Sequence, residues 1–415
     1  MKKQGKSRVN SNRLHLTRVY LDCAAATPVD KEVEKAMQPY MGKLYANPGG
    51  LHKEGVEAKN ALVSARASIA SILFARPEEI IFTSGGTESD NLAVLGIVTS
   101  YKLQVTKKKP HIVTTNIEHS AVREVCKFLE ENKMAEVTYV PVESNGIVDP
   151  KKIRSALKGN TVLVSVMYVN NEIGTIQPIS EIAKSIRHFK KLRRGDGIYP
   201  LFHTDAAQAI AYLPVRVDRL GVDLLSCNGA KIYGPKGVGF LYVKKSTPIK
   251  SMLHGGNQEY DLRAGTENMP GIIGIAKALE ICEKLKEKES NRLTKLRNYF
   301  IEQIKKHIPE AVLNGDQITR LPNNVNISIP QIDSELLVLE LDACGIAVSS
   351  KSACKSDDPD ESYVISALRI GGKPGFPQEE GSVRFSMGRQ TTKQDIDYTL
   401  KTLKQIIVKI KKWKM

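Results

Sequence analysis

The sequence lacks the features that mark several common protein classes. No run in its 415 residues approaches the roughly 20 continuous apolar residues of a membrane-spanning helix. Its six cysteines are scattered and show no Cys-x-x-Cys spacing, which argues against a disulfide scaffold and a zinc site. No internal repeat or low-complexity linker interrupts the chain. We therefore expect a globular, cytoplasmic protein whose thiols stay reduced and which has no membrane partner.

Acidic residues are scarce at the two ends of the chain. The formal net charge is +16, residues 1–18 contain no acid, and residues 401–415 combine an apolar helical stripe with many lysines. We interpret residues 1–18 as a basic extension and the last segment as a solvated basic helix. A docking surface for an acidic protein or a tRNA is the alternative, although no direct nucleic-acid binding is required.

Short apolar runs alternate with longer helical patterns. We predict strands at residues 80–83, 111–115, 161–166 and 200–204, and helices near 52–73, 87–100, 120–132 and 178–193. This alternation is typical of an α/β fold with a mostly parallel sheet sandwiched by helices. Such sheets bind ligands beyond the carboxyl ends of their strands.

The length of the chain predicts two domains, because a single core rarely grows to this size. Residues 274–310 read as one long helix, and strands are expected at 323–329 and 346–349. We place a large domain at residues 19–270 and a smaller α/β domain at residues 271–415, with the segment near 19–30 packing on the smaller one.

Lys231 is the most informative single residue. It follows the apolar run 222–225, which reads as a buried strand, and precedes a turn rich in glycine and proline. Burial disfavours the charged ammonium, and a lysine with a lowered pKa can form a Schiff base with an aldehyde cofactor. The alternative is an ordinary solvated lysine beside a turn.

Further polar residues follow the predicted strands and are expected at the same edge of the sheet. Gly86 and Thr87 begin a helix, whose free N–H groups can bind a phosphate, although Thr87 can instead cap the helix. His119 can stack on a planar ring and shuttle protons, or it can hold a helix start through a structural hydrogen bond.

Amide and carboxylate side chains complete this set. Asn171, next to Asn170, can hydrogen-bond a ring hydroxyl, and a plain Asx turn is the alternative. Asp205 can pair with a protonated pyridine nitrogen, or it can cap a helix. Gln208 lies one helical turn further on and can reach the ring oxygen. With Lys231 and the phosphate cradle, these residues describe a site for pyridoxal 5′-phosphate.

Several stretches resemble the cysteine desulfurases, pyridoxal-phosphate enzymes of the class V aminotransferase family with the type I fold. They are Tyr20-Leu21-Asp22, residues 82–89, 169–174 and 231–237, and Arg263-Ala264-Gly265-Thr266. Residues 349–354, Ser-Ser-Lys-Ser-Ala-Cys, are similar to the catalytic-cysteine segment of the members with a long active-site loop, which would span residues 349–382. A buried structural cysteine is the alternative for Cys354, but its lysine and serine neighbours suit an exposed thiolate.

The resemblance implies a function and a set of roles. The chain would convert L-cysteine to L-alanine and leave a persulfide on Cys354 for an iron–sulfur scaffold protein or an acceptor in tRNA thiolation. Catalysis would rest on Lys231, Cys354 and His119, and Arg384 and Asn47 would bind the substrate carboxylate. A homodimer is implied. No metal site is firm, and Cys354 is only a candidate for transient iron–sulfur ligation. The implied cofactor contacts are Gly86, Thr87, His119, Asn171, Asp205, Gln208, Asn228, Lys231 and Thr266.

Three positions depart from the family pattern. Asn228 and Ala230 stand where the family has a serine and a histidine that touch the cofactor phosphate. Ala230 has no donor, so we expect weaker cofactor binding, by about 1–3 kcal/mol for each lost contact. Lys351 replaces a glycine near Cys354, where it can lower the thiol pKa or alter acceptor docking. A selenocysteine lyase, and a non-catalytic sulfur-relay protein with a degraded site, are the alternative functions.

Overall fold

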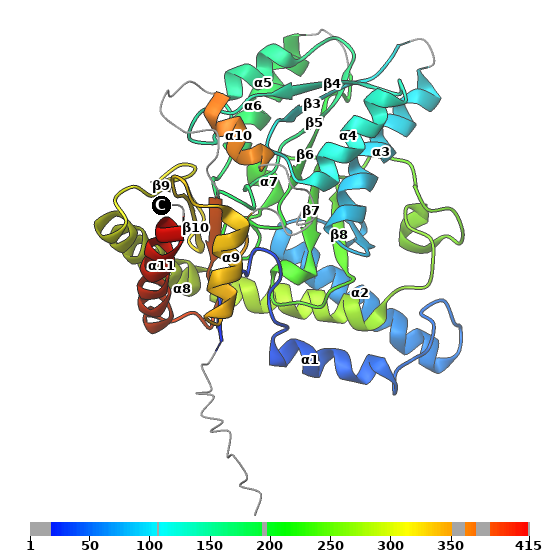
Figure 1. Cartoon of the computed structure of the whole chain (residues 1–415). Coiled ribbons are helices and arrows are strands. Elements are labelled where there is room, and N and C mark those ends of the chain that lie inside the picture. Colours follow the sequence, from blue (N-terminus) through cyan, green and yellow to red (C-terminus); the bar gives the residue numbers. More distant parts are fainter. Residues whose placement is uncertain (1–17, 106–107, 193–196, 351–361, 371–381, 414–415) are drawn as a thin grey trace, which may run out of the picture.

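The computed structural model describes residues 18–105, 108–192, 197–350, 362–370 and 382–413 (Figure 1). Its strands are β1 Val19–Tyr20, β2 Ile80–Thr83, β3 His111–Thr115, β4 Glu136–Val140, β5 Thr161–Ser165, β6 Leu201–Asp205, β7 Leu224–Asn228, β8 Gly239–Val243, β9 Val312–Leu313, β10 Asn324–Ser328, β11 Ile346–Ala347 and β12 Ser382–Ser386. Its α-helices are α1 Lys31–Met37, α2 Lys53–Leu73, α3 Gly86–Gln104, α4 Ser120–Glu131, α5 Pro150–Ala156, α6 Ile179–Leu192, α7 Val217–Leu220, α8 Met269–His307, α9 Ser334–Ala343, α10 Tyr363–Ile370 and α11 Lys393–Trp413. Short 3₁₀ helices lie at Gln38–Met41, Pro77–Glu79, Gly229–Lys231 and Gln258–Asp261.

The central sheet has seven strands in the order β2-β8-β7-β6-β5-β3-β4. The strands predicted near residues 80, 111, 161 and 200 are all present in it, each within a residue of its expected bounds. β8 runs in the direction opposite to the other six strands of this sheet. The connection from β7 to β8 is too short for the helical crossover that a parallel pair requires, so the chain turns back at Lys231.

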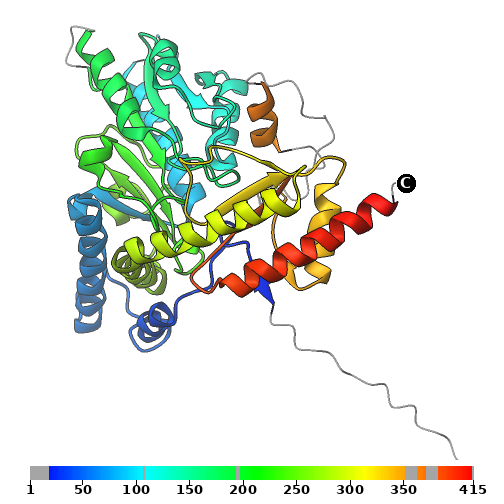
Figure 2. The ribbon, with the colours of Figure 1, turned by 90° about the vertical axis from the view of Figure 1, so that its left-hand side faces the viewer.

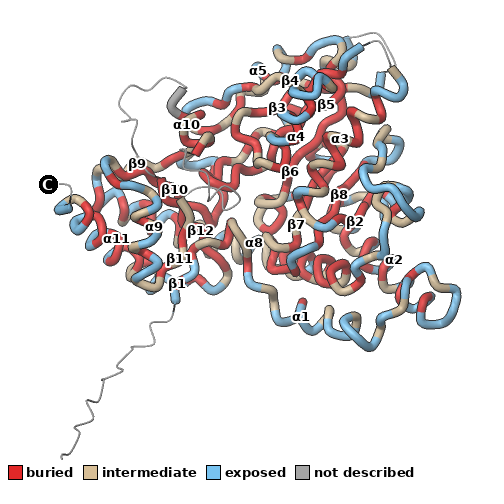
Figure 3. The backbone as a smooth tube through the Cα atoms, turned by 45° about the vertical axis from the view of Figure 1, so that its right-hand side comes forward, coloured by how far each residue is buried: buried red, intermediate tan, exposed pale blue. Residues whose placement is uncertain are grey.

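Helices cover both faces of this sheet, as alternation along the strands requires. Leu224 packs with the apolar residues of α3 and α4, whereas its neighbour Leu225 packs with those of α2, α6 and α8. Figure 3 shows the sheet as a continuous buried layer beneath these helices. The structure is therefore the expected α/β fold.

A separate apolar core lies around the three-stranded sheet β12-β10-β9 and the pair β1-β11. Helix α8 is long (Figure 2). It contributes to both cores, through Ile275 in its first half and Phe300 in its second. It begins five residues before the expected position 274, because the Asn268 side chain accepts a hydrogen bond from the N–H of Gly271 and caps it. The division into domains at residues 18 and 270 stays a prediction.

The N-terminal segment and the basic C-terminal helix both belong to this second core. Val19 pairs with Ile346 in parallel, 327 positions along the chain. Helix α11 buries an apolar stripe, and its Lys409 and Lys411 form ion pairs with Glu340 and Glu310. Among the described residues, none of the helices combines the length and the apolar character needed to cross a membrane.

Candidate active site

Nine of the residues predicted from the sequence line one cavity at the carboxyl ends of the central strands. They come from the loops that follow β2, β3, β5, β6 and β7, together with β12 of the second core. The cavity holds about 120 Å³. The predicted residues in its wall are Gly86, Thr87, His119, Asn171, Asp205, Gln208, Asn228, Lys231 and Arg384.

One end of the cavity is formed by the first turn of α3. Gly85 precedes the helix with a φ of +155°, a conformation that favours glycine, and Gly86 is the first helical residue. Thr87 therefore lies inside the helix and does not cap it. The side-chain oxygen of Asn228 accepts the N–H of Ala230, while its amide nitrogen lies beside Gly86. The free N–H groups of this turn and the Asn228 amide are suited to an anion.

Lys231 closes the cavity from the turn between β7 and β8. Its ammonium donates to the backbone carbonyl of Ala25, in the segment that follows β1. Gln208 donates from Nε2 to the neighbouring carbonyl of Ala24, 3.0 Å away. The chain near residue 25 therefore forms a wall that orients both side chains, a contribution that the sequence patterns did not identify.

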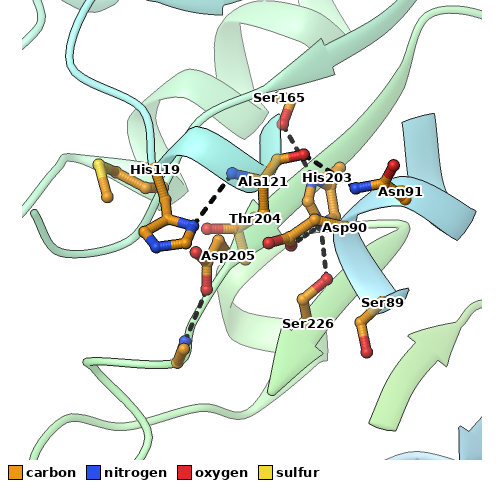
Figure 4. A network of polar contacts seen from close by, with 12 residues as sticks. Ser89, Asp90, Asn91, His119, Ala121, Ser165, His203, Thr204, Asp205 and Ser226 are labelled. Atoms are coloured by element: carbon orange, nitrogen blue, oxygen red, sulfur yellow. Dashed lines mark hydrogen bonds and ion pairs between the residues drawn. The ribbon is translucent and has the colours of Figure 1, made fainter. Parts of the chain in front are cut away.

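Asp205 and His119 lie at the centre of the site (Figure 4). The Oδ1 atom of Asp205 accepts the N–H of Ala207 at 2.8 Å, and Nδ1 of His119 accepts the N–H of Ala121 at 3.1 Å. His119 thus caps α4, the structural role offered as its alternative, whereas Asp205 holds a turn at residues 207–212 and not a helix; both side chains also line the cavity. Burial raises the pKa of the Asp205 carboxyl, and His119, the Ala207 N–H and Lys231 oppose that rise.

The two adjacent asparagines divide the two roles that the sequence left open. Asn170 makes the Asx turn, because its Oδ1 accepts the N–H groups of Glu172 and Ile173 at 2.9 and 3.0 Å. Asn171 is the one that lines the cavity. The turn made by Asn170 holds its neighbour at the cavity wall.

Arg384 crosses from β12 to the cavity and is almost fully buried. Its guanidinium donates to Oδ1 of Asp22 at 2.7 Å and to the carbonyl of Asn171 at 3.1 Å. Its Nε has no hydrogen-bond partner among the described residues. A buried guanidinium with a free donor is suited to bind a carboxylate.

Two predicted residues that the structure describes, Asn47 and Thr266, are not among those that line this cavity. Asn47 is exposed, and its side-chain oxygen accepts the N–H of Gly49 at 2.8 Å. Thr266 is also exposed. Cys354 and Lys351 lie outside the described residues, as does most of the loop expected at 349–382.

Asp90, a carboxyl in the cavity wall, was not predicted from the sequence. It lies on α3, one helical turn after Gly86, and is 1% exposed. The signal that could have identified it is a charged residue on an otherwise apolar face of a helix. Such a residue is informative because a buried carboxylate requires a hydrogen-bonding or ionic partner.

The donor set fits pyridoxal phosphate. A helix start offers N–H groups for the phosphate, Lys231 offers an amine for the aldehyde, and Asp205 offers a carboxyl for the ring nitrogen. The guanidinium of Arg384 lines the same cavity and can bind a substrate carboxylate.

Comparisons with known proteins show the family to which the chain belongs. The family described as aminotransferase class-V matches residues 19–399. The chain is 46% identical to "Cysteine desulfurase IscS" of Dictyoglomus turgidum over 95% of both chains. It superposes on a solved "NIFS-LIKE PROTEIN" with a TM-score of 0.85 at 34% identity, covering 94% of this chain and 99% of the other. A solved structure described as "SspA in complex with cysteine" matches with a TM-score of 0.73 at 32% identity, over 89% and 98% of the two chains. The chain belongs to the cysteine desulfurases of the aminotransferase class-V family.

Proposed function

We propose that this protein is a pyridoxal-phosphate-dependent cysteine desulfurase that transfers the sulfur of L-cysteine to Cys354. The observation that carries the proposal is the single cavity in which Lys231, Asp205, His119 and Arg384 meet. Its relatives carry the name cysteine desulfurase, and one solved neighbour is described as a complex with cysteine.

Each side chain has a task that follows from its position. The first turn of α3, with Gly86 and Thr87, binds the phosphate, and Asp205 pairs with the ring nitrogen. When bound, the cofactor accepts the electron pair released at the substrate Cα. Lys231 anchors the cofactor and then carries the Cα proton. His119 stacks on the ring and assists proton transfer.

Substrate binding falls to Arg384. Its guanidinium binds the α-carboxylate of cysteine, while Asp22 and the Asn171 carbonyl keep the group oriented. Asn47 is exposed and is not among the residues that line this cavity. It contributes to substrate binding only if a second subunit packs against this region and forms a site with it.

The sulfur step is carried by Cys354. Its thiolate attacks the substrate sulfur, a new S–S bond forms, and the bond between Cβ and sulfur breaks. The electron pair of the broken bond is protonated at Cβ, so that the products are alanine and a persulfide on Cys354. The persulfide sulfur then passes to an iron–sulfur scaffold protein or to an acceptor in tRNA thiolation.

The same proposal includes a homodimer in the cytoplasm. Exposed apolar side chains occur at Tyr45, Leu51 and Leu253, in the same two regions as the exposed Asn47 and Thr266. An interface there would bury them and bring Thr266 to the phosphate of the partner subunit. The free thiols at Cys23, Cys126, Cys227, Cys282 and Cys344 suit a reducing compartment.

The test incubates the purified protein with pyridoxal phosphate, L-cysteine and a reductant, and quantifies alanine and sulfide. We expect both products from the wild type and neither from Cys354→Ala, with Cys344→Ala as the matched control that keeps activity. Bound cofactor without turnover of cysteine, but with turnover of selenocysteine, would favour a selenocysteine lyase. A protein that binds no cofactor would contradict the proposal.

A further inference from the structure

Asp90 is a buried carboxyl to which the proposed reaction assigns no role. Its Oδ1 has no hydrogen-bond partner among the described residues. One oxygen of Asp90, one oxygen of Asp205 and one ring nitrogen of His119 all lie within 4.8 Å of one another (Figure 4). Two buried carboxyls at such a distance cannot both ionise readily, because each negative charge raises the pKa of the other group.

The surroundings decide which of the two carboxyls ionises. Asp205 accepts the N–H of Ala207, and His119 and Lys231 lower its pKa. Asp90 instead faces His203 on β6, with 3.6 Å between Oδ1 and Nε2. Burial lowers the pKa of His203 to about 3, so this imidazole is neutral and offers Asp90 no compensating charge.

A row of polar side chains lies behind Asp90. The two ring nitrogens of His203 bond to the hydroxyls of Ser165 and Ser226, at 2.8 and 2.9 Å. Burial and the charge of Asp205 raise the pKa of Asp90 well above its ordinary value, the Ser226 hydroxyl opposes this, and Glu118 adds to it. Glu118 is itself buried, and its pKa rises to about 8. The titratable groups that face the pair are therefore His119, Glu118, His203 and Lys231.

We propose that Asp90 stays protonated at neutral pH and acts as a positioning residue for Asp205, so that the pair carries one negative charge. The inference rests on the proposed function, in which Asp205 meets the ring nitrogen of the cofactor. A single negative charge matches a single protonated ring nitrogen, and a second one would be left uncompensated in the buried site. The Asp90 hydroxyl keeps a donor available for the row formed by His203 and Ser226.

The direct test follows carboxyl-¹³C aspartate signals by NMR in the cofactor-free protein as the pH is varied. Asp90→Asn removes the Asp90 signal and so identifies it. Asp223→Asn is the control, because it removes a carboxylate that immediately precedes β7 and accepts the N–H of Phe202, at the other end of these strands. We expect the Asp90 signal at the protonated position at neutral pH. An ionised Asp90 would overturn the proposal. If Asp90→Asn does not fold, displacement of the signal by Ser226→Ala assigns it.

A second measurement uses the reconstituted enzyme. The pH midpoint of the bound cofactor's absorbance reports the charge that faces the ring. We expect Asp205→Asn to shift this midpoint strongly and Asp90→Asn to shift it several-fold less, even where both lower the melting temperature similarly. Equal shifts would mean that Asp90 carries a charge, which contradicts the proposal. The NMR readout needs neither cofactor nor turnover, so failure of this inference is distinguishable from failure of the proposed function.

Discussion

Arg384 and Asp22 are 362 positions apart in the sequence and form an ion pair at the cavity wall, with 2.7 Å between Nη2 and Oδ1. Their side chains are 2% and 16% exposed, so water screens the pair little. The pair joins β12 to the segment that follows β1. It therefore fixes the proposed substrate-binding guanidinium and ties the start of the chain to the cavity.

Removal of the Asp22 charge should destabilise the fold. Asp22→Asn leaves the buried guanidinium of Arg384 without its counter-ion, and we expect the free energy of unfolding to fall by about 3 kcal/mol. Urea unfolding measures the change. Asp218→Asn is the control, because its pair with Arg216 is exposed and should contribute less than about 1 kcal/mol. Equal losses in the two variants would show that burial does not strengthen the Asp22 pair.

Restoring the family residue at position 230 should tighten cofactor binding. Ala230→His adds a donor where the family has a phosphate contact, and we expect the apo protein to bind pyridoxal phosphate about tenfold more tightly, or about 1.4 kcal/mol. Fluorescence titration measures the affinity. Ala230→Leu adds bulk without a donor and should not tighten binding. A gain in both variants would point to packing instead of a hydrogen bond.

Glu118 should make the fold less stable as the pH rises. Burial raises its pKa from 4.5 to about 8, so between these values the folded state holds a proton that the unfolded state has lost. The stability from this group is fully present below pH 4.5 and declines toward pH 8, by up to about 1.4 kcal/mol per pH unit. Glu118→Gln should flatten that decline in unfolding measurements across this range. The exposed Glu131→Gln should leave it unchanged, and a wild-type curve without the decline would refute the prediction.

Tyr363 should hold α10 against the wall of the large sheet. Its hydroxyl donates to the carbonyl of Glu118 at 2.5 Å, and Arg123 lies over its ring at 4.1 Å. Tyr363→Phe keeps the ring and removes the hydrogen bond. We therefore expect the free energy of unfolding to fall by about 1 kcal/mol and amide hydrogen exchange in α10 to become faster. Tyr398→Phe removes a comparable bond to the carbonyl of Cys344 and should leave exchange in α10 unchanged. Unaltered exchange in the Tyr363 variant would mean that other contacts hold this helix.

Much of the fold follows from local patterns in the sequence. The runs at 80–83, 111–115, 161–166 and 200–204 are apolar and bounded by polar residues or turns, and each forms a strand. Because parallel strands end at one edge, the polar residues after them were expected together, and Thr87, His119, Asn171, Asp205 and Gln208 do line one cavity. The direction of β8 could not be read in this way, since its apolar run is the same in either orientation.

What the sequence by itself determined is which chemical groups stand after which strand, including Lys231 and Asp205, because apolar runs and glycine turns act over a few residues. Only the tertiary structure decided how groups from distant segments meet. It brought Asp90 on α3 against Asp205, assigned the turn to Asn170 and the cavity wall to Asn171, and paired Arg384 with Asp22. These relationships depend on packing across the sheet and between the two cores, where burial and short distances, not sequence spacing, set each group's charge and partners.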